Sequence, residues 1–166
     1  MAEGEPRAGS APEAAAAPGF ELALLLVGGF RSLVDELHRR LAAEEHPDLR
    51  PAHGFAMQAV GVAGATATEV GARLGVSKQA AGKTIDGLVR MGYVERRGDP
   101  HDGRRKLVVL TERGEDCLRR SARIFDELRD EWAAVLGRSR LEALHRDLRK
   151  MASTTSSIDV PGWLSD

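Results

Sequence analysis

The 166-residue chain has little of several residue types, and each shortage excludes a class of protein. Cys117 is its only cysteine, so an intramolecular disulfide and a cysteine-rich zinc site are both excluded. No apolar run approaches the length of a membrane span. The opening residues, MAEGEPRAGSAPEAAAAPG, lack the basic-then-apolar order of a secretory signal, so we expect a cytoplasmic location.

Aromatic residues are also scarce, at 4%, whereas the apolar share of 42% and the charged share of 30% are typical of an ordinary globular protein. Ala, Leu, Glu and Arg dominate, which favours helices. The chain is long enough for one domain with a real core. Nowhere does the sequence supply a nucleophile, a base and an orienting group together. We therefore expect no enzyme activity, no cofactor and no metal site.

Both ends of the chain differ from its middle. Residues 1–18 are rich in Ala, Pro, Glu and Gly, and they are predicted to be a disordered tail because they bury too little to offset the entropy of ordering. The final segment contains Ile158, Val160, Trp163 and Leu164, which predict that it docks on the fold.

Long amphipathic helices are predicted at residues 20–45 and 112–136, the second of them capped by Thr111. A last helix follows to about residue 155, opened by a capping box of Ser139 and Glu142. A monomer would leave the long apolar stripes of these helices uncovered. We therefore expect a twofold homodimer, with a monomer built around one core as the alternative.

The middle of the chain predicts a helix-turn-helix. After a short helix over 51–60, a capping box of Thr66 and Glu69 opens a helix that closes at a tight glycine turn. Ser77 then caps a second helix over 78–90. Two short strands follow, around a loop rich in Gly, Pro and Asp, and they add a wing to the module. The expected strands are 93–97 and 106–110, and the expected loop is 98–103.

Charge is distributed unevenly along the chain. Residues 73–106 contain nine Arg or Lys and four acidic residues, a balance of +5. The remainder contains fifteen basic and twenty-one acidic residues, a balance of -6. A basic module on an acidic body is typical of a nucleic-acid reader that does not bind through its whole surface.

In a helix-turn-helix, the second helix lies in the major groove with its first turns against the base edges. Gln79 can pair with adenine there, and Lys78 or Lys83 can reach guanine or phosphate. Arginines at a wing tip suit the minor groove, and Asp102 can pair with one of them and hold the loop shape. The predicted DNA contacts are Thr66, Thr68, Ser77, Lys78, Gln79, Lys83, Arg104 and Arg105.

The wing resembles that of the MarR (multiple antibiotic resistance regulator) family. The similar segments are Gly92–Arg96, Asp99–Arg104 and Val109–Gly114, and Leu74–Ser77 is similar to the family's turn. In helix order the resemblance covers roughly residues 20–155. Many members have an Arg directly before the main wing Arg, whereas here Gly103 occupies that position and Arg105 follows.

The resemblance implies a mainly α (α+β) winged helix-turn-helix with long N- and C-terminal dimerisation helices. One such domain would span residues 19–166, with the winged module at about 50–111 and the dimerisation helices at about 20–45 and 112–156. Arg104 would be the minor-groove arginine and Asp102 its structural partner. The partners would be operator DNA and a second copy of this chain. The function would be that of a repressor that a small-molecule effector releases from DNA.

Members of the family often bind small aromatic effectors between the dimer helices and the winged module, so the resemblance implies an effector site there. Candidate lining residues are Phe30, Arg31, His53, Met57 and Phe125, with a core role as the alternative for Phe30, Met57 and Phe125. Other open alternatives are a protein-interaction module without DNA binding, redox sensing at Cys117, and zinc sensing. The sequence places Cys117 on an apolar stripe, which favours an inert thiol. The zinc candidates are His38, Glu44, Glu45, His46 and His53.

Overall fold

The structure is a computed structural model that describes residues 18–99 and 105–152. The chain divides into two units between Ser32 and Leu33, within its first helix. The fold is mainly helical with one two-stranded antiparallel sheet, as predicted. Within the described residues, no helix is both long enough and apolar enough to cross a bilayer.

Helix α1 spans Gly19–Ala43 and ends two residues before the predicted position. Its N-terminal half, up to Ser32, presents large apolar side chains to solvent. In its C-terminal half, Leu37 and Leu41 are buried in the core of the second unit. The following turn has left-handed backbone at Glu45 (φ 70°), just after the end of the helix, and again at Asp48 (φ 62°), just after His46-Pro47.

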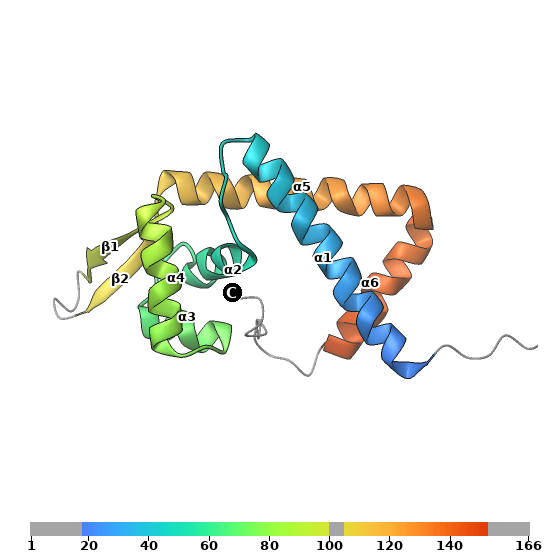
Figure 1. Cartoon of the computed structure of the whole chain (residues 1–166), viewed down its shortest axis with the longest axis horizontal. Coiled ribbons are helices and arrows are strands. Elements are labelled where there is room, and N and C mark those ends of the chain that lie inside the picture. Colours follow the sequence, from blue (N-terminus) through green and yellow to red (C-terminus); the bar gives the residue numbers. More distant parts are fainter. Residues whose placement is uncertain (1–17, 100–104, 153–166) are drawn as a thin grey trace, which may run out of the picture. The chain divides into compact units, whose positions relative to one another are not determined.

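The winged module begins with α2 (Pro51–Val60), whose proline sits in the first turn, where no intrahelical N–H is needed. Helix α3 (Ala67–Leu74) ends at Gly75 in the left-handed conformation, and α4 (Lys78–Arg90) begins directly after the turn. The predicted caps are confirmed, because the side chains of Thr66 and Ser77 accept backbone N–H bonds from the first turns of these helices. Figure 1 shows α3 and α4 side by side at one end of the module, and the two helices are in extensive contact.

Strands β1 (Val94–Gly98) and β2 (Lys106–Leu110) form the stem of the wing. They pair antiparallel, with Val94 opposite Leu110 and Gly98 opposite Lys106. Ala65 joins β2 through a pair of backbone hydrogen bonds with Val108, at 3.0 and 2.8 Å. The stem is thereby tied to a residue just before α3. Residues 100–103 of the predicted loop lie outside the described part.

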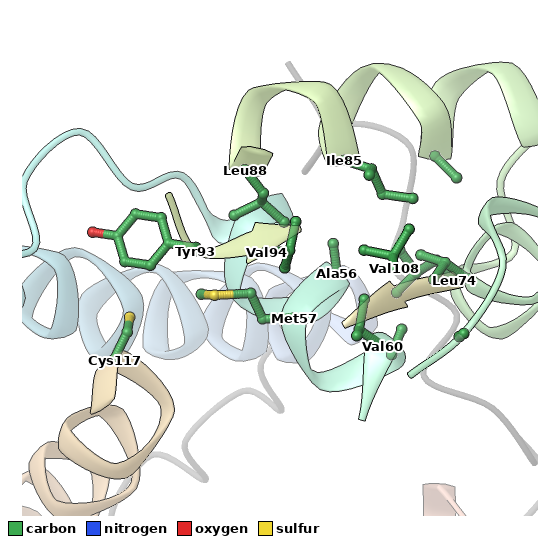
Figure 2. Packing of buried hydrophobic residues seen from close by; sticks show 14 of the residues in the cluster. Ala56, Met57, Val60, Leu74, Ile85, Leu88, Tyr93, Val94, Val108 and Cys117 are labelled. Atoms are coloured by element: carbon green, nitrogen blue, oxygen red, sulfur yellow. The ribbon is translucent and has the colours of Figure 1, made fainter. Parts of the chain in front are cut away.

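The core of the module is made where α2, α4, the sheet and α5 meet (Figure 2). Tyr93, Ile85 and Leu88 are at most 1% exposed, and burying side chains of this size contributes about 1.5–3 kcal/mol each. Because Ala81, Ile85 and Leu88 recur at spacings of four and three, one face of α4 is buried and the other is open. Ala80 and Val89 lie off this buried face and are exposed.

Helix α5 spans Glu112–Leu136 and α6 spans Arg138–Ala152. The predicted Thr111 cap of α5 is confirmed. The predicted cap of α6 at Ser139 is wrong by two residues, because the helix begins at Arg138, directly after Gly137. The carbonyl of Gly137, which has a φ of 87°, accepts the first bond of α6 from the N–H of Leu141 at 3.1 Å, so a single glycine ends one helix and starts the next.

Ion pairs join the C-terminal half of α1 to α5. Arg40 contacts Glu131 at 2.7 Å and Glu127 at 3.2 Å, and Glu44 contacts Arg120 at 2.9 Å. These pairs are partly exposed, so each contributes little on its own. Together they fix which side of α1 faces α5.

Tyr93 connects β1, α5 and the turn after α1. Its hydroxyl lies 3.2 Å from Nδ1 of the buried His46, whose Nε2 lies 3.1 Å from the carboxylate of Asp116. Arg113 donates to the same hydroxyl at 3.3 Å and to the carbonyl of Glu45 at 2.7 Å, and its guanidinium lies 4.8 Å from the centroid of the Tyr93 ring. The buried polar atoms of His46 and Tyr93 therefore both have partners, which is the condition under which such groups stabilise a fold.

Gly114 allows the first turn of α5 to approach Tyr93. A Cβ at this position would lie 2.1 Å from the carbonyl oxygen of Tyr93, so no larger residue fits without moving backbone. We predict that Gly114→Ala lowers the free energy of unfolding by at least about 2 kcal/mol, measured by urea denaturation.

The control is Gly54→Ala within α2, where a Cβ would meet no atom within 4 Å. Alanine is a better helix former, so this variant should be more stable by up to about 1 kcal/mol. Equal stability of the two variants would contradict the proposed close approach.

Candidate nucleic-acid interface

The exposed face of α4 borders an open groove of about 560 Å³. Three of the predicted DNA contacts, Ser77, Gln79 and Lys83, line this groove together with Gly82. A Cβ at Gly82 would meet no atom within 4 Å, so the helix surface is low at this point. Such a surface allows a base edge to approach the backbone of the helix closely.

The N-terminus of α4 is open to solvent beside this groove. The Ser77 hydroxyl accepts a hydrogen bond from the N–H of Ala80 at 3.1 Å, and Lys78 and Gln79 in the first turn are exposed. The first N–H groups of a helix lack intrahelical partners and favour an anion. A phosphate group could therefore be bound at this helix start.

Asp86, which is not among the predicted DNA contacts, lines the same groove. Its carboxylate is paired with Arg96 of β1 at 2.7 Å, so this ion pair ties the middle of α4 to the wing stem. Asp86 lies three residues after Lys83 and seven after Gln79. This helical spacing could have placed it on the same face.

Glu69 links the start of α3 to the wing. One of its carboxylate oxygens accepts from the backbone N–H of Thr66 at 2.7 Å and from the Thr66 hydroxyl at 2.9 Å, while the other contacts Arg105 at 3.0 Å. The bonds from Thr66, followed by the charge of Arg105, hold the pKa of Glu69 below its usual value. Thr66 is thus engaged within the cap, whereas Thr68 lies on the first turn and is exposed to solvent.

Arg105 was predicted to contact DNA, and in this structure it has acidic partners. Besides Glu69, its guanidinium lies 3.6 Å from the carboxylate of Asp99. It is still about half exposed, so these pairs position the side chain beside α3 without burying it. The predicted minor-groove residue Arg104 and its partner Asp102 lie outside the described residues.

Of the predicted effector residues, only His53 lines a described cavity. This cavity has a volume of about 850 Å³ and lies between α2 and the side of α4. Met57 is 1% exposed and belongs to the core, as its alternative interpretation held, whereas Phe125 is exposed on α5. Phe30 and Arg31 lie in the N-terminal half of α1, the other unit.

The zinc alternative has no support in residues 18–99 and 105–152, where no three His, Cys, Asp or Glu side chains form a metal-binding group. His46 is instead bonded to Tyr93 and Asp116. Cys117 is fully buried, and burial raises the pKa of its thiol. Both features favour the inert thiol over a redox switch.

Several solved structures share this fold. The chain superposes on RV1404 from Mycobacterium tuberculosis with a TM-score of 0.68 and 19% identity, covering 87% of this chain and 99% of that one. The superposition on apo MarR from E. coli has a TM-score of 0.63 at 24% identity, and it covers 81% of this chain and 97% of that one. A point mutant of S. aureus MepR, bound to an oligodeoxyribonucleotide, superposes with a TM-score of 0.55 at 20% identity. This match covers 80% of this chain and 96% of that one. No curated protein matches the sequence.

The fold and its exposed helix α4 define a winged helix-turn-helix protein. Residues 48–105 match the model of the MarR family, so the resemblance of this chain to that family is confirmed. The family match and the shared fold support the broader class expected from the sequence, a DNA-binding transcriptional regulator.

Because the Thr66 hydroxyl is bonded within the cap of α3, its loss should affect stability. We predict that Thr66→Ala lowers the free energy of unfolding by about 1 kcal/mol, whereas Thr68→Ala in the first turn changes it by less than about 0.5 kcal/mol. Denaturant melts of the two variants measure this difference. Equal losses would show that the cap does not act as described.

Proposed function

We propose that this chain is a homodimeric repressor that binds a palindromic DNA operator and is released by a small-molecule effector. The observation that carries the proposal is the exposed face of α4, where Ser77, Gln79 and Lys83 meet at one groove beside an open helix start. The winged module around it belongs to the part of the chain that matches the MarR family. The S. aureus MepR mutant of the same fold is itself bound to an oligodeoxyribonucleotide.

In this proposal, α4 lies in the major groove. Gln79 contacts a base edge, while Lys78 and Lys83 contact phosphate or guanine. Thr66, Thr68 and Ser77 lie at the starts of α3 and α4 and bind the DNA backbone. Arg104 and Arg105 reach the minor groove from the wing, and Asp102 supports the loop.

Exposed apolar side chains support the homodimer. Val62 apart, the most exposed large apolar residues lie on the predicted dimerisation helices, and a monomer rarely leaves an extended apolar surface open. On the N-terminal half of α1 they are Phe20, Leu22, Leu24, Leu25, Leu26 and Val27. On α6 they include Leu144 and Leu148. Two copies joined by twofold symmetry would present two α4 helices to half-sites about one DNA turn apart.

The dimer can be tested by sedimentation. Leu22→Glu combined with Leu25→Glu should convert a dimer into a monomer at micromolar concentration, since two buried charges per copy would be unpaired. Val62→Glu is the control, because Val62 is 99% exposed in the turn before α3 and its change should leave the dimer intact. A wild-type protein that sediments as a monomer would refute this part of the proposal.

DNA reading can be tested on a promoter fragment recovered by genomic footprinting. Gln79→Ala should reduce discrimination between this fragment and random duplex by about 1–3 kcal/mol, while random-duplex affinity changes little. Lys83→Gln should weaken binding to both duplexes and reduce the slope of log affinity against log salt by about 1. Fluorescence anisotropy at several salt concentrations measures all of these quantities.

Arg138→Gln on α6 removes one positive charge outside the winged module and serves as the control. It should leave affinity and salt slope nearly unchanged. A wild-type protein with no preference for its own promoter fragment would favour the protein-interaction alternative over DNA binding.

A further inference from the structure

Arg105 lies directly before β2, and two acidic residues hold its side chain in place. Nη2 of its guanidinium donates to the carboxylate of Glu69 at 3.0 Å, and Nη1 lies 3.6 Å from the carboxylate of Asp99. The backbone N–H of Asp99 donates to the carbonyl of Arg105 at 3.1 Å, so the main chain is fixed at this point as well. Both terminal nitrogens of the guanidinium therefore face carboxylates of the same protein.

The carboxylate of Glu69 is held from its other side by α3. Its second oxygen accepts hydrogen bonds from the backbone N–H and the hydroxyl of Thr66, at 2.7 and 2.9 Å. Because these bonds belong to the cap of α3, the carboxylate is not free to follow Arg105 when that side chain moves. The side chains of Arg105 and Glu69 are 45% and 44% exposed, so an anion from outside can reach the guanidinium.

DNA and these carboxylates compete for the same N–H groups of Arg105. Arginine binds phosphate best through two parallel N–H bonds, so the binding of Arg105 to DNA requires it to leave at least one of its two acids. Glu69 would then lose this partner at the start of α3, where the proposed function places the DNA backbone. The broken ion pair and the uncompensated carboxylate both oppose binding.

We propose that Glu69 competes with DNA for Arg105, and that this internal ion pair lowers the affinity of the protein for every duplex. Glu69 acts through Arg105 and contacts no base. Since the pair is made in the free protein, its effect is the same on operator and random duplex. The strength of exposed ion pairs corresponds to an effect of about two- to fivefold in affinity. This inference rests on the proposed DNA-binding function.

The test replaces Glu69 by glutamine in the full-length protein. Capping boxes accept either Glu or Gln, so the cap of α3 and the fold should be retained. Glu69→Gln should raise the affinity for operator and for random duplex about two- to fivefold, measured by fluorescence anisotropy at moderate salt.

Glu112→Gln is the matched control, because it removes the same charge from an exposed glutamate at the start of α5. Glu112 makes no ion pair within residues 18–99 and 105–152. Its loss acts on DNA only through screened, longer-range forces and should change the affinity less than about 1.5-fold.

Arg105→Gln decides whether Glu69 acts through the arginine. In the Arg105→Gln background, Glu69→Gln should change the affinity no more than Glu112→Gln does, and a double-mutant cycle measures this coupling. A gain that persists in full without Arg105 would show plain repulsion between the acid and DNA, which would overturn the competition. An unchanged or lower affinity in Glu69→Gln alone would overturn it as well, because the ion pair would then persist in the complex.

A measurement without DNA separates this inference from the proposed function. Because a nearby cation lowers the pKa of a carboxyl group, the pKa of Glu69 should rise toward its usual value in Arg105→Gln, as followed by carbon NMR. An unchanged pKa would show that the pair is absent in solution, which refutes the competition and leaves the proposed function standing. A raised pKa in a protein that binds no duplex would refute the proposed function, and the competition with it.

Discussion

The position of the winged module within its unit depends on the contacts of Tyr93. This residue lies between α4, the helix proposed to read the major groove, and β1, the first strand of the wing stem. Its ring is buried, its hydroxyl is bonded to Arg113 and lies beside His46, and its carbonyl oxygen lies against Gly114. The Thr111 hydroxyl also donates to the carbonyl of Gly92 at 2.6 Å, one residue earlier. Because α5 and its cap make all but one of these contacts, the long helix and the reading helix are held in one defined relation.

The electrostatic design follows from the same arrangement. Acidic and basic side chains between the C-terminal half of α1 and α5 neutralise each other in ion pairs, as Arg40 does with Glu131. On the open face of α4, Lys83 has no such partner within the described residues and is available to an anion. The net positive charge of residues 73–106 thus includes a lysine on the exposed face of α4 that is not neutralised by an ion pair within the described residues. This explains how a chain with a net charge of -1 can present a cationic surface.

Much of the fold could be predicted because its signals are local. Thr66, Ser77 and Thr111 are caps whose partners lie three residues away, and Gly75 permits the left-handed turn that ends α3. The reading face of α4 was partly predictable from helical spacing. The bonds of His46 to Tyr93 and Asp116, and of Arg105 to Glu69, were not, because these partners lie 36 or more residues away in the chain and only the fold brings them together. The cavity beside α4 could not be predicted either, since Arg50 and Arg90 line one cavity only after α2 packs on α4.

The carboxylate of Glu69 contacts two elements at once. One oxygen accepts a hydrogen bond from the backbone N–H of Thr66, the cap residue of α3, and the other contacts Arg105 beside the wing. A wing taken from another protein and joined to this module would keep its own strands. It would lose the ion pair with Glu69 unless it also carried an arginine at the position of Arg105. Grafted wings should therefore be chosen for a matching basic residue directly before β2, as much as for the DNA bases that the wing recognises.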